Sequence, residues 1–227
     1  MSTYLLIDIG AGTMDILFWD DASPLHYKAV VRSPVPYLAD TIGSCPGDLL
    51  ITGQEMGGGS ITTVLKKRVQ EHRVVISEKA SATLHHDKDR IAAWGIEVVR
   101  EEEAQKMITT GQRNHFVTAD IDAGRLKKIV NGLGVPFELD VVGICAQDHG
   151  VPPKGVSHLD YRHRLFTAAL DKEPHAHALL YEKDAVPPTM NRLKSIAESA
   201  GSLPAKEVYV MDSGMAAIQG ASLDNLA

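Results

Sequence analysis

Cysteine is nearly absent from this sequence: Cys45 and Cys145 are the only two among 227 residues. Two cysteines are too few for a disulfide framework and form no C-x-x-C pair, so we expect both to be reduced thiols. Cys145 lies in the apolar run of residues 141–146, where a small thiol serves most simply as core filler. A nucleophilic role beside Asp148 and His149 is the alternative.

Runs of positive charge and long apolar runs are also missing. The formal net charge is -6, and no basic cluster of the kind that binds nucleic acids or anionic membranes occurs. No apolar stretch approaches the ~20 residues that span a bilayer, and a strand pattern begins directly after Met1 without the features of a signal peptide. The ten histidines show no zinc-site spacing. We therefore expect a cytoplasmic protein that binds neither nucleic acid nor membrane.

The most informative segment that is present spans residues 5–20, where two apolar strand patterns flank a glycine-rich turn. Asp8 stands near the end of the first strand, and Gly10 and Gly12 allow φ values and a close approach that a side chain would block. Thr13 adds a hydroxyl, and Asp8 can hold hydrated Mg²⁺, which uses one or two protein carboxylates together with substrate phosphates. An ordinary β-hairpin turn is the alternative, because Gly and Asp are common there.

This string, DIGAGTMD at residues 8–15, resembles the first phosphate motif of the ATPase superfamily that includes actin, the sugar kinases and the heat-shock chaperones. It differs from a P-loop, which requires G-x-x-x-x-G-K-[ST]. The resemblance implies ATP as the ligand, with Mg²⁺ held through water at Asp8, which would also act in catalysis. The residues that it implies as contacts for the nucleotide are Asp8, Gly10, Ala11, Gly12, Thr13 and Asp15.

A second segment, residues 207–221, has the pattern of a short strand followed by a helix of small residues. It resembles the connecting strand and helix of the same superfamily, where small residues let helices approach closely. Two registers are open: one places Asp212 near the metal and its water, and the other places Gln219 where a glutamine orients the attacking water. The resemblance also implies a nucleotide contact at Gly214. A plain core helix is the alternative.

Apolar periodicity predicts the order of the elements. An antiparallel meander of strands is predicted over residues 4–9, 14–19 and 26–32. From residue 48 strands and helices alternate, which favours parallel pairing with crossover helices. The strands predicted there are 49–52, 73–77 and 96–100, and the helices are 60–71 and 87–94. Farther along, strands are predicted at 116–121 and 138–146, and helices at 122–133, 159–171 and 188–200.

Two loops are further candidates for ligand binding. The glycine loop at residues 57–59 opens a helix whose amide groups attract anions, and a flexible turn capped by Ser60 is the alternative. Asp148 and His149 follow the strand 138–146, and ligands gather outside the carboxyl ends of strands in α/β sheets. A polar turn is the competing explanation for these two residues.

The alternation of strands and helices predicts an α/β fold. The resemblance implies a ribonuclease-H-like lobe of the actin type, with a mixed sheet that has a three-stranded antiparallel start and flanking helices. We expect residues 1–33 and 116–227 to form this N-terminal ATPase lobe, and residues 34–115 to form an inserted α/β subdomain.

Four strings together, IDIGAGTMDI, GQEMGGG, AQDHG and DSGMAAIQGA, resemble an uncharacterised prokaryotic family whose members are labelled pyruvate formate-lyase activating enzymes. The resemblance covers essentially the whole chain. We do not expect that activity, because glycyl-radical activases need a C-x-x-x-C-x-x-C triad for their iron–sulfur cluster and the sequence has two cysteines.

The superfamily ATPases bind their nucleotide between two lobes, and this sequence stops after the connecting helix. We therefore expect an ATP-binding lobe of an actin-like ATPase that is incomplete without a second lobe or a homodimer partner. Whether it is an enzyme stays open; an ATPase or a small-molecule kinase with Asp148 as base are the enzymatic forms. The alternative is a non-catalytic scaffold or regulatory interaction module that retains the fold.

Overall fold

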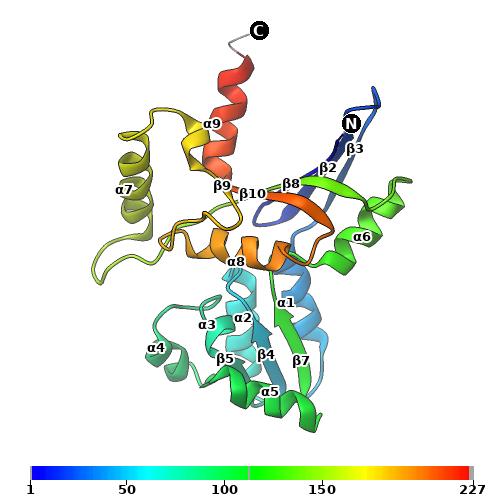
Figure 1. The fold of residues 1–227 in the computed structure, drawn as a ribbon. Helices are drawn as coiled ribbons and strands as arrows, with labels where there is room; N and C mark the ends of the chain where they lie inside the picture. Colours follow the sequence, from blue (N-terminus) through cyan, green and yellow to red (C-terminus); the bar gives the residue numbers. More distant parts are fainter. Residues whose placement is uncertain (1, 112, 225–227) are drawn as a thin grey trace. The chain divides into compact units, whose positions relative to one another are not determined.

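The computed structural model describes residues 2–111 and 113–224, and the chain divides into two compact units (Figure 1). The first unit comprises Met1–Val31 and Ile121–Ala227, and the second is Arg32–Asp120, where we expected an insert over residues 34–115. The first unit contains a mixed sheet and the second a parallel sheet. The predicted α/β class is confirmed at this level.

A six-stranded sheet forms the centre of the first unit, in the order β3-β2-β1-β8-β10-β9. The strand bounds are β1 Thr3–Ile9, β2 Thr13–Asp20, β3 His26–Arg32, β8 Leu139–Ala146, β9 Leu180–Glu182 and β10 Ala205–Asp212. β1, β8 and β10 run parallel to one another, whereas β2 and β9 pair antiparallel with β1 and β10. All of these strands except the three-residue β9 were predicted from the sequence.

The helices of the first unit are α6 (Ala123–Gly132), α7 (His158–Leu170), α8 (Asn191–Ala200) and α9 (Ser213–Asp224), with a 3₁₀ turn at Ala176–Leu179. Asp122 caps α6 as predicted, because its carboxylate accepts a hydrogen bond from the backbone N–H of Arg125. α8 begins at Asn191, later than the predicted start at residue 188.

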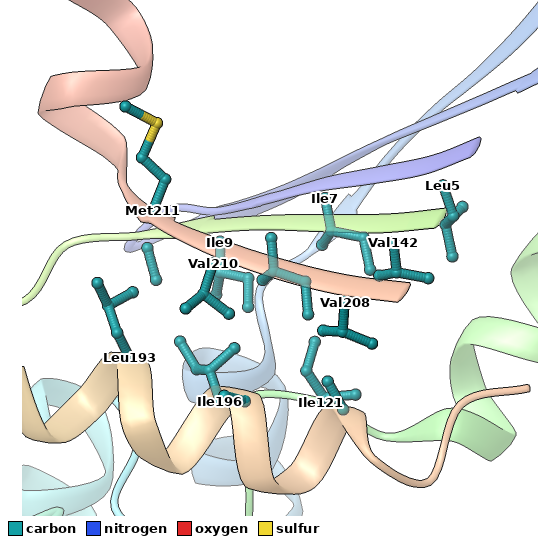
Figure 2. Packing of buried hydrophobic residues seen from close by; sticks show 14 of the residues in the cluster. Leu5, Ile7, Ile9, Ile121, Val142, Leu193, Ile196, Val208, Val210 and Met211 are labelled. Atoms are coloured by element: carbon teal, nitrogen blue, oxygen red, sulfur yellow. The ribbon is translucent and has the colours of Figure 1, made fainter. Parts of the chain in front are cut away.

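The core of the first unit lies between one face of the sheet and α8, and Figure 2 shows this packing. Alternation along the strands places Leu5, Ile7 and Ile9 of β1 on this face, and Leu193 and Ile196 of α8 pack toward it. Met211, near the end of β10, points to the opposite side of the sheet (Figure 2). One face of the sheet is therefore covered by α8, and Met211 lies on the other face.

The second unit has a four-stranded parallel sheet in the order β6-β5-β4-β7. The strands are β4 Leu49–Gly53, β5 Val74–Ser77, β6 Glu97–Val99 and β7 Asn114–Thr118. The helices are α1 Pro34–Ser44, α2 Gly59–Arg68, α3 Glu78–Ser81, α4 Lys88–Ala93 and α5 Glu101–Thr110. The predicted parallel pairing of this segment is confirmed, whereas α1, α3 and α5 were not predicted.

Both faces of this second sheet carry apolar clusters. The larger one packs side chains of β4 and β5 such as Ile51 and Ile76 against Ile42 of α1 and Leu65 of α2. The smaller one packs Leu50 and Val75 against α5. Among the described helices, none combines the length and the apolar character needed to cross a bilayer.

Candidate functional site

The N-terminal hairpin places its glycine turn at the surface. The backbone N–H of Gly10 donates to the carbonyl of Thr13 at 3.0 Å, and the whole turn from Gly10 to Thr13 is exposed. Neither Gly10 nor Gly12 adopts a left-handed φ, so the expectation that these glycines supply unusual backbone angles is wrong. A side chain at Gly10 would press on the carbonyl of Thr13 at 3.1 Å, whereas one at Gly12 would meet nothing within 4 Å. Gly12 is therefore not required by packing inside the described chain.

Two carboxylates face each other across this hairpin. Asp8 of β1 pairs directly with Asp15 of β2, and both side chains are exposed. The hydroxyl of Thr13 donates to Asp15 at 3.2 Å, and the hydroxyl of Ser213 donates to Asp8 at 3.0 Å. Like charges directly opposite on neighbouring strands repel, so a cation near this pair would stabilise the hairpin.

The carboxylate of Asp212 is buried, with only 1% of the residue exposed, where β10 ends and α9 begins. One oxygen accepts from the guanidinium of Arg162 at 2.5 Å and from the backbone N–H of Gly214 at 2.8 Å. The other oxygen accepts from the backbone N–H of Asp148 at 3.0 Å. Asp212 thus joins β10, α7 and the loop after β8.

Gly214 is a glycine for a packing reason that the sequence does not reveal. A Cβ there would lie 3.0 Å from the Arg162 guanidinium and 3.1 Å from the Asp212 carboxylate. Its N–H is engaged by Asp212. Gln219 lies farther along α9, half-buried, and within the described residues no hydrogen bond joins its side chain to Asp8 or Asp212. The nucleotide and water roles of these residues stay predictions.

Asp148 is also buried, at 1% exposure, and it holds backbone rather than facing solvent. Its two oxygens accept from the N–H groups of Gly150 at 2.8 Å and Leu193 at 2.9 Å. This geometry favours a structural role over that of a kinase base, because the carboxylate has no exposed oxygen to offer a substrate. His149 beside it is half-buried, and burial together with the positive charges of Arg162 and His158 lowers its pKa.

The sheet face opposite α8 is open, and we call it the open sheet face. A cavity of about 420 Å³ lies on it, lined by side chains that include Leu6, Asp8, Leu17, Val30, Leu180 and Met211. Cys145 lines the same cavity, and burial together with the charges of Asp8 and Asp212 raises the pKa of its thiol to about 11. A thiol held protonated in this way is a poor nucleophile, which disfavours thiol chemistry here.

Mg²⁺ is the metal that the hairpin motif implies. Among the described residues, no group of three or more His, Cys, Asp or Glu side chains is placed to hold a metal ion. The pair Asp8 and Asp15 nevertheless fits Mg²⁺, since this ion keeps several waters and shares one or two carboxylates with substrate phosphates.

The two groups that sequence analysis missed are Arg162 and the hydroxyl of Ser213. Ser213 follows Asp212 within the string DSGMAAIQGA, so this motif could have pointed to its hydroxyl. Arg162 lies on α7, 50 residues from its partner Asp212, and no local pattern marks it.

The glycine loop at residues 57–59 belongs to the second unit and is closely packed. A Cβ at Gly58 would lie 1.7 Å from the carbonyl oxygen of Thr83, and the Thr83 hydroxyl accepts from the N–H of Met56 at 3.1 Å. The helix starts at Gly59 with Gly58 as its cap, so the expectation of a flexible turn capped by Ser60 is wrong.

A family model matches most of this chain. No curated protein matches this chain. The model of a family described as "Putative pyruvate format-lyase activating enzyme (DUF1786)" matches residues 56–227, which include Asp148 and Asp212 but not the hairpin of Asp8. The matched range is shorter than the resemblance over essentially the whole chain that the four strings suggested, but it covers well over half of the sequence. The chain therefore belongs to the DUF1786 family.

Proposed function

We propose that the first unit is the nucleotide-binding lobe of an actin-like ATPase with a ribonuclease-H-like fold. The observation that carries the proposal is the hydrogen bond from Ser213 to Asp8, which spans 205 residues of sequence. It joins the two segments that resemble the superfamily, which lie at opposite ends of the sequence.

The sheet topology supports this assignment. Asp8 and Asp212 lie near the carboxyl ends of β1 and β10, which flank β8 in parallel register. Ligands of α/β sheets bind outside the carboxyl ends of parallel strands. In this proposal the phosphates of ATP lie against the exposed turn of Gly10, Ala11, Gly12 and Thr13.

Asp8 and Asp15 are the residues that would hold Mg²⁺. When bound, the ion neutralises phosphate charge, which is its main contribution to phosphoryl transfer. Asp212 orders the loop after β8 and the start of α9 around the site, because its oxygens accept hydrogen bonds from both. Gln219 remains the candidate for orienting water, and a second lobe or a second copy of the chain would complete the cleft.

The activity in the family description is not part of this proposal. An iron–sulfur cluster of a radical activase takes three cysteine thiolates from a C-x-x-x-C-x-x-C triad. The sequence contains Cys45 and Cys145 only.

Thermal unfolding followed by circular dichroism tests the proposal. Millimolar Mg-ATP should raise the melting temperature of the chain, because a ligand selective for the folded state stabilises it. Asp8→Asn should abolish this shift while leaving the ligand-free melting temperature equal or higher, since it removes the repulsion with Asp15. Asp171→Asn, at an exposed aspartate without a side-chain hydrogen bond in the described chain, is the matched control and should keep the shift.

Gly12→Ala separates ligand binding from folding. Since the added methyl group meets nothing within 4 Å, the ligand-free melting temperature should stay unchanged. The methyl group would stand where phosphate approaches, so the Mg-ATP shift should shrink. A wild-type chain without any Mg-ATP shift would refute nucleotide binding by this unit.

A non-catalytic interaction module is the second candidate, and the open sheet face favours it. Leu6, Val30 and Leu180 on this face are 41%, 66% and 46% exposed. Apolar side chains gathered on one face are typical of interaction surfaces. Absence of the Mg-ATP shift would favour this candidate.

A further inference from the structure

The parallel sheet of the second unit contains a point at which the strand order reverses. The chain passes from β4 to β5 to β6 in one direction and then returns to place β7 on the other side of β4. All three neighbouring pairs are parallel. In open sheets of this kind, ligands bind outside the carboxyl ends of the strands near such a reversal.

A cavity of about 260 Å³ lies at this edge, and we call it the switch-point cavity. Its lining includes Thr52 and Gln54 at the end of β4, Lys79 just after β5, and Glu101, Ala104 and Ile108 on α5, which follows β6. Gly53 also lines it with φ +113°, and a Cβ there would lie 2.3 Å from the carbonyl oxygen of Thr118. The backbone of β4 at Gly53 therefore lies so close to Thr118 of β7 that a side chain would not fit there.

One cation and one anion line the switch-point cavity. The ammonium group of Lys79 is exposed and has no partner among the described residues. The carboxylate of Glu101 is half-buried, and one of its oxygens accepts from the backbone N–H of Lys79 at 2.8 Å. Its other oxygen accepts no hydrogen bond within the described chain.

Gln54 contributes an unsatisfied acceptor. Its side-chain carbonyl oxygen is buried and receives no hydrogen bond from the described residues. A buried acceptor without a donor costs free energy, and rotation of the Gln54 side chain toward an N–H group of a ligand in the cavity would remove this cost. Ala104 and Ile108 contribute methyl groups from α5, and the polar side chains of Thr52 and Gln105 complete the lining.

We propose that the switch-point cavity binds a free α-amino acid with a small aliphatic side chain. The carboxylate of the amino acid pairs with Lys79 and its side chain contacts Ala104 and Ile108. Its ammonium group donates to Glu101 and, once the Gln54 side chain has rotated toward the cavity, to the carbonyl oxygen of Gln54. The cavity of about 260 Å³ is smaller than the roughly 300–1,000 Å³ of pockets for drug-sized ligands, which favours a ligand as small as a free amino acid. This proposal is independent of nucleotide binding by the first unit.

Titration of the ¹⁵N-labelled full chain with L-valine, followed through amide chemical shifts, tests the proposal. We expect saturable shifts at Gly53, Gln54, Lys79 and Gln105, and weaker binding of isovalerate and isobutylamine, which each lack one charged group. Lys79→Met should lower the valine affinity about tenfold, the size expected for one charge-assisted hydrogen bond. Lys106→Met, at an exposed lysine of α5 outside the cavity lining, is the matched control and should leave the affinity unchanged.

Three results would overturn the proposal: no saturable shift at these amides up to tens of millimolar valine, equal affinity for isovalerate and valine, or equal effects of Lys79→Met and Lys106→Met. Lys79 is exposed, so its substitution is not expected to disturb folding. The circular dichroism spectrum of each variant checks this directly.

Discussion

Arg162 forms a buried ion pair with Asp212: 13% of the arginine side chain and 2% of the aspartate side chain are exposed. Its guanidinium also lies 4.8 Å from the ring centre of Phe166. Removing one partner of a buried pair leaves the other charge uncompensated, which costs far more than losing a surface pair. The stability of the site should therefore depend on this one side chain.

We predict that Arg162→Met lowers the free energy of unfolding by roughly 3 kcal/mol, because the Asp212 carboxylate loses its cation while it stays buried. Urea denaturation measures the change. Arg164→Met, at an exposed arginine of the same helix, should change stability by less than about 1 kcal/mol. Equal effects of the two substitutions would contradict the structural role of the pair.

His149 should make the stability depend on pH. Its pKa is lowered from 6.5, first by burial and then by the charges of Arg162 and His158. Between this lowered value and 6.5 the folded chain binds fewer protons than the unfolded chain, so the free energy of unfolding falls as the pH is reduced through that interval.

We predict that His149→Phe makes the loss of stability on acidification shallower, and urea denaturation near pH 7 and near pH 5 measures the difference. His115, whose pKa burial also lowers, titrates in both proteins and keeps its own share of the pH dependence. An unchanged slope in the variant would show that His149 is not responsible.

At the scale of single residues, local patterns predicted part of the site. Asp8 and the glycine turn could be found because strand, turn and strand are neighbours in sequence. The bonds of Asp212 could not, because its donors come from residue 148, from residue 162 and from residue 214, and only the last is local. The burial of Asp148 could not be predicted from local sequence for the same reason, because its partner Leu193 lies 45 residues away.

The elements themselves differ in how far local sequence specifies them. The hairpin strands alternate buried and exposed residues, which is a clear signal. α1 starts with two prolines in its first turn and α5 with three glutamates, both compatible with helix starts, yet neither was predicted because their apolar periodicity is short. β9 has three residues and exists through its pairing with β10, which no local pattern reveals.

The start of α2 offers a sharp test at the level of elements. We predict that Gly58→Ala destabilises the chain by at least about 2 kcal/mol, because the added methyl group would lie 1.7 Å from the Thr83 carbonyl. Gly59→Ala should keep stability within about 1 kcal/mol, because its Cβ meets nothing within 4 Å and alanine suits a helix. Urea denaturation compares the neighbours, and similar stabilities would show that the loop is not packed as described.

For the whole molecule, the unfolding of the two units can be measured separately if they unfold independently, because each unit has its own hydrophobic core. The two tryptophans fall one in each unit: Trp19 stacks on Tyr4, with ring centres 5.0 Å apart, and Trp94 lies under the ammonium of Lys66. Fluorescence of Trp94→Phe and Trp19→Phe variants therefore reports the units separately.

We predict that Leu193→Ala shifts mainly the transition reported by Trp19, and Leu65→Ala mainly that reported by Trp94. Both leucines are fully buried, and such truncations cost about 2–5 kcal/mol. If Leu65→Ala moved the Trp19 transition as far as the Trp94 transition, the units would unfold as one body.

The open sheet face has a practical consequence for work in solution. Dyes that become fluorescent on apolar surfaces report unfolding only when the native protein leaves them dark. With Leu6, Val30 and Leu180 exposed on one sheet, the native chain should already bind such a dye. The fluorescence of the native protein should then be high at the start and fall when a ligand or partner covers this face. The dye would therefore report the occupancy of the face rather than the melting of the protein.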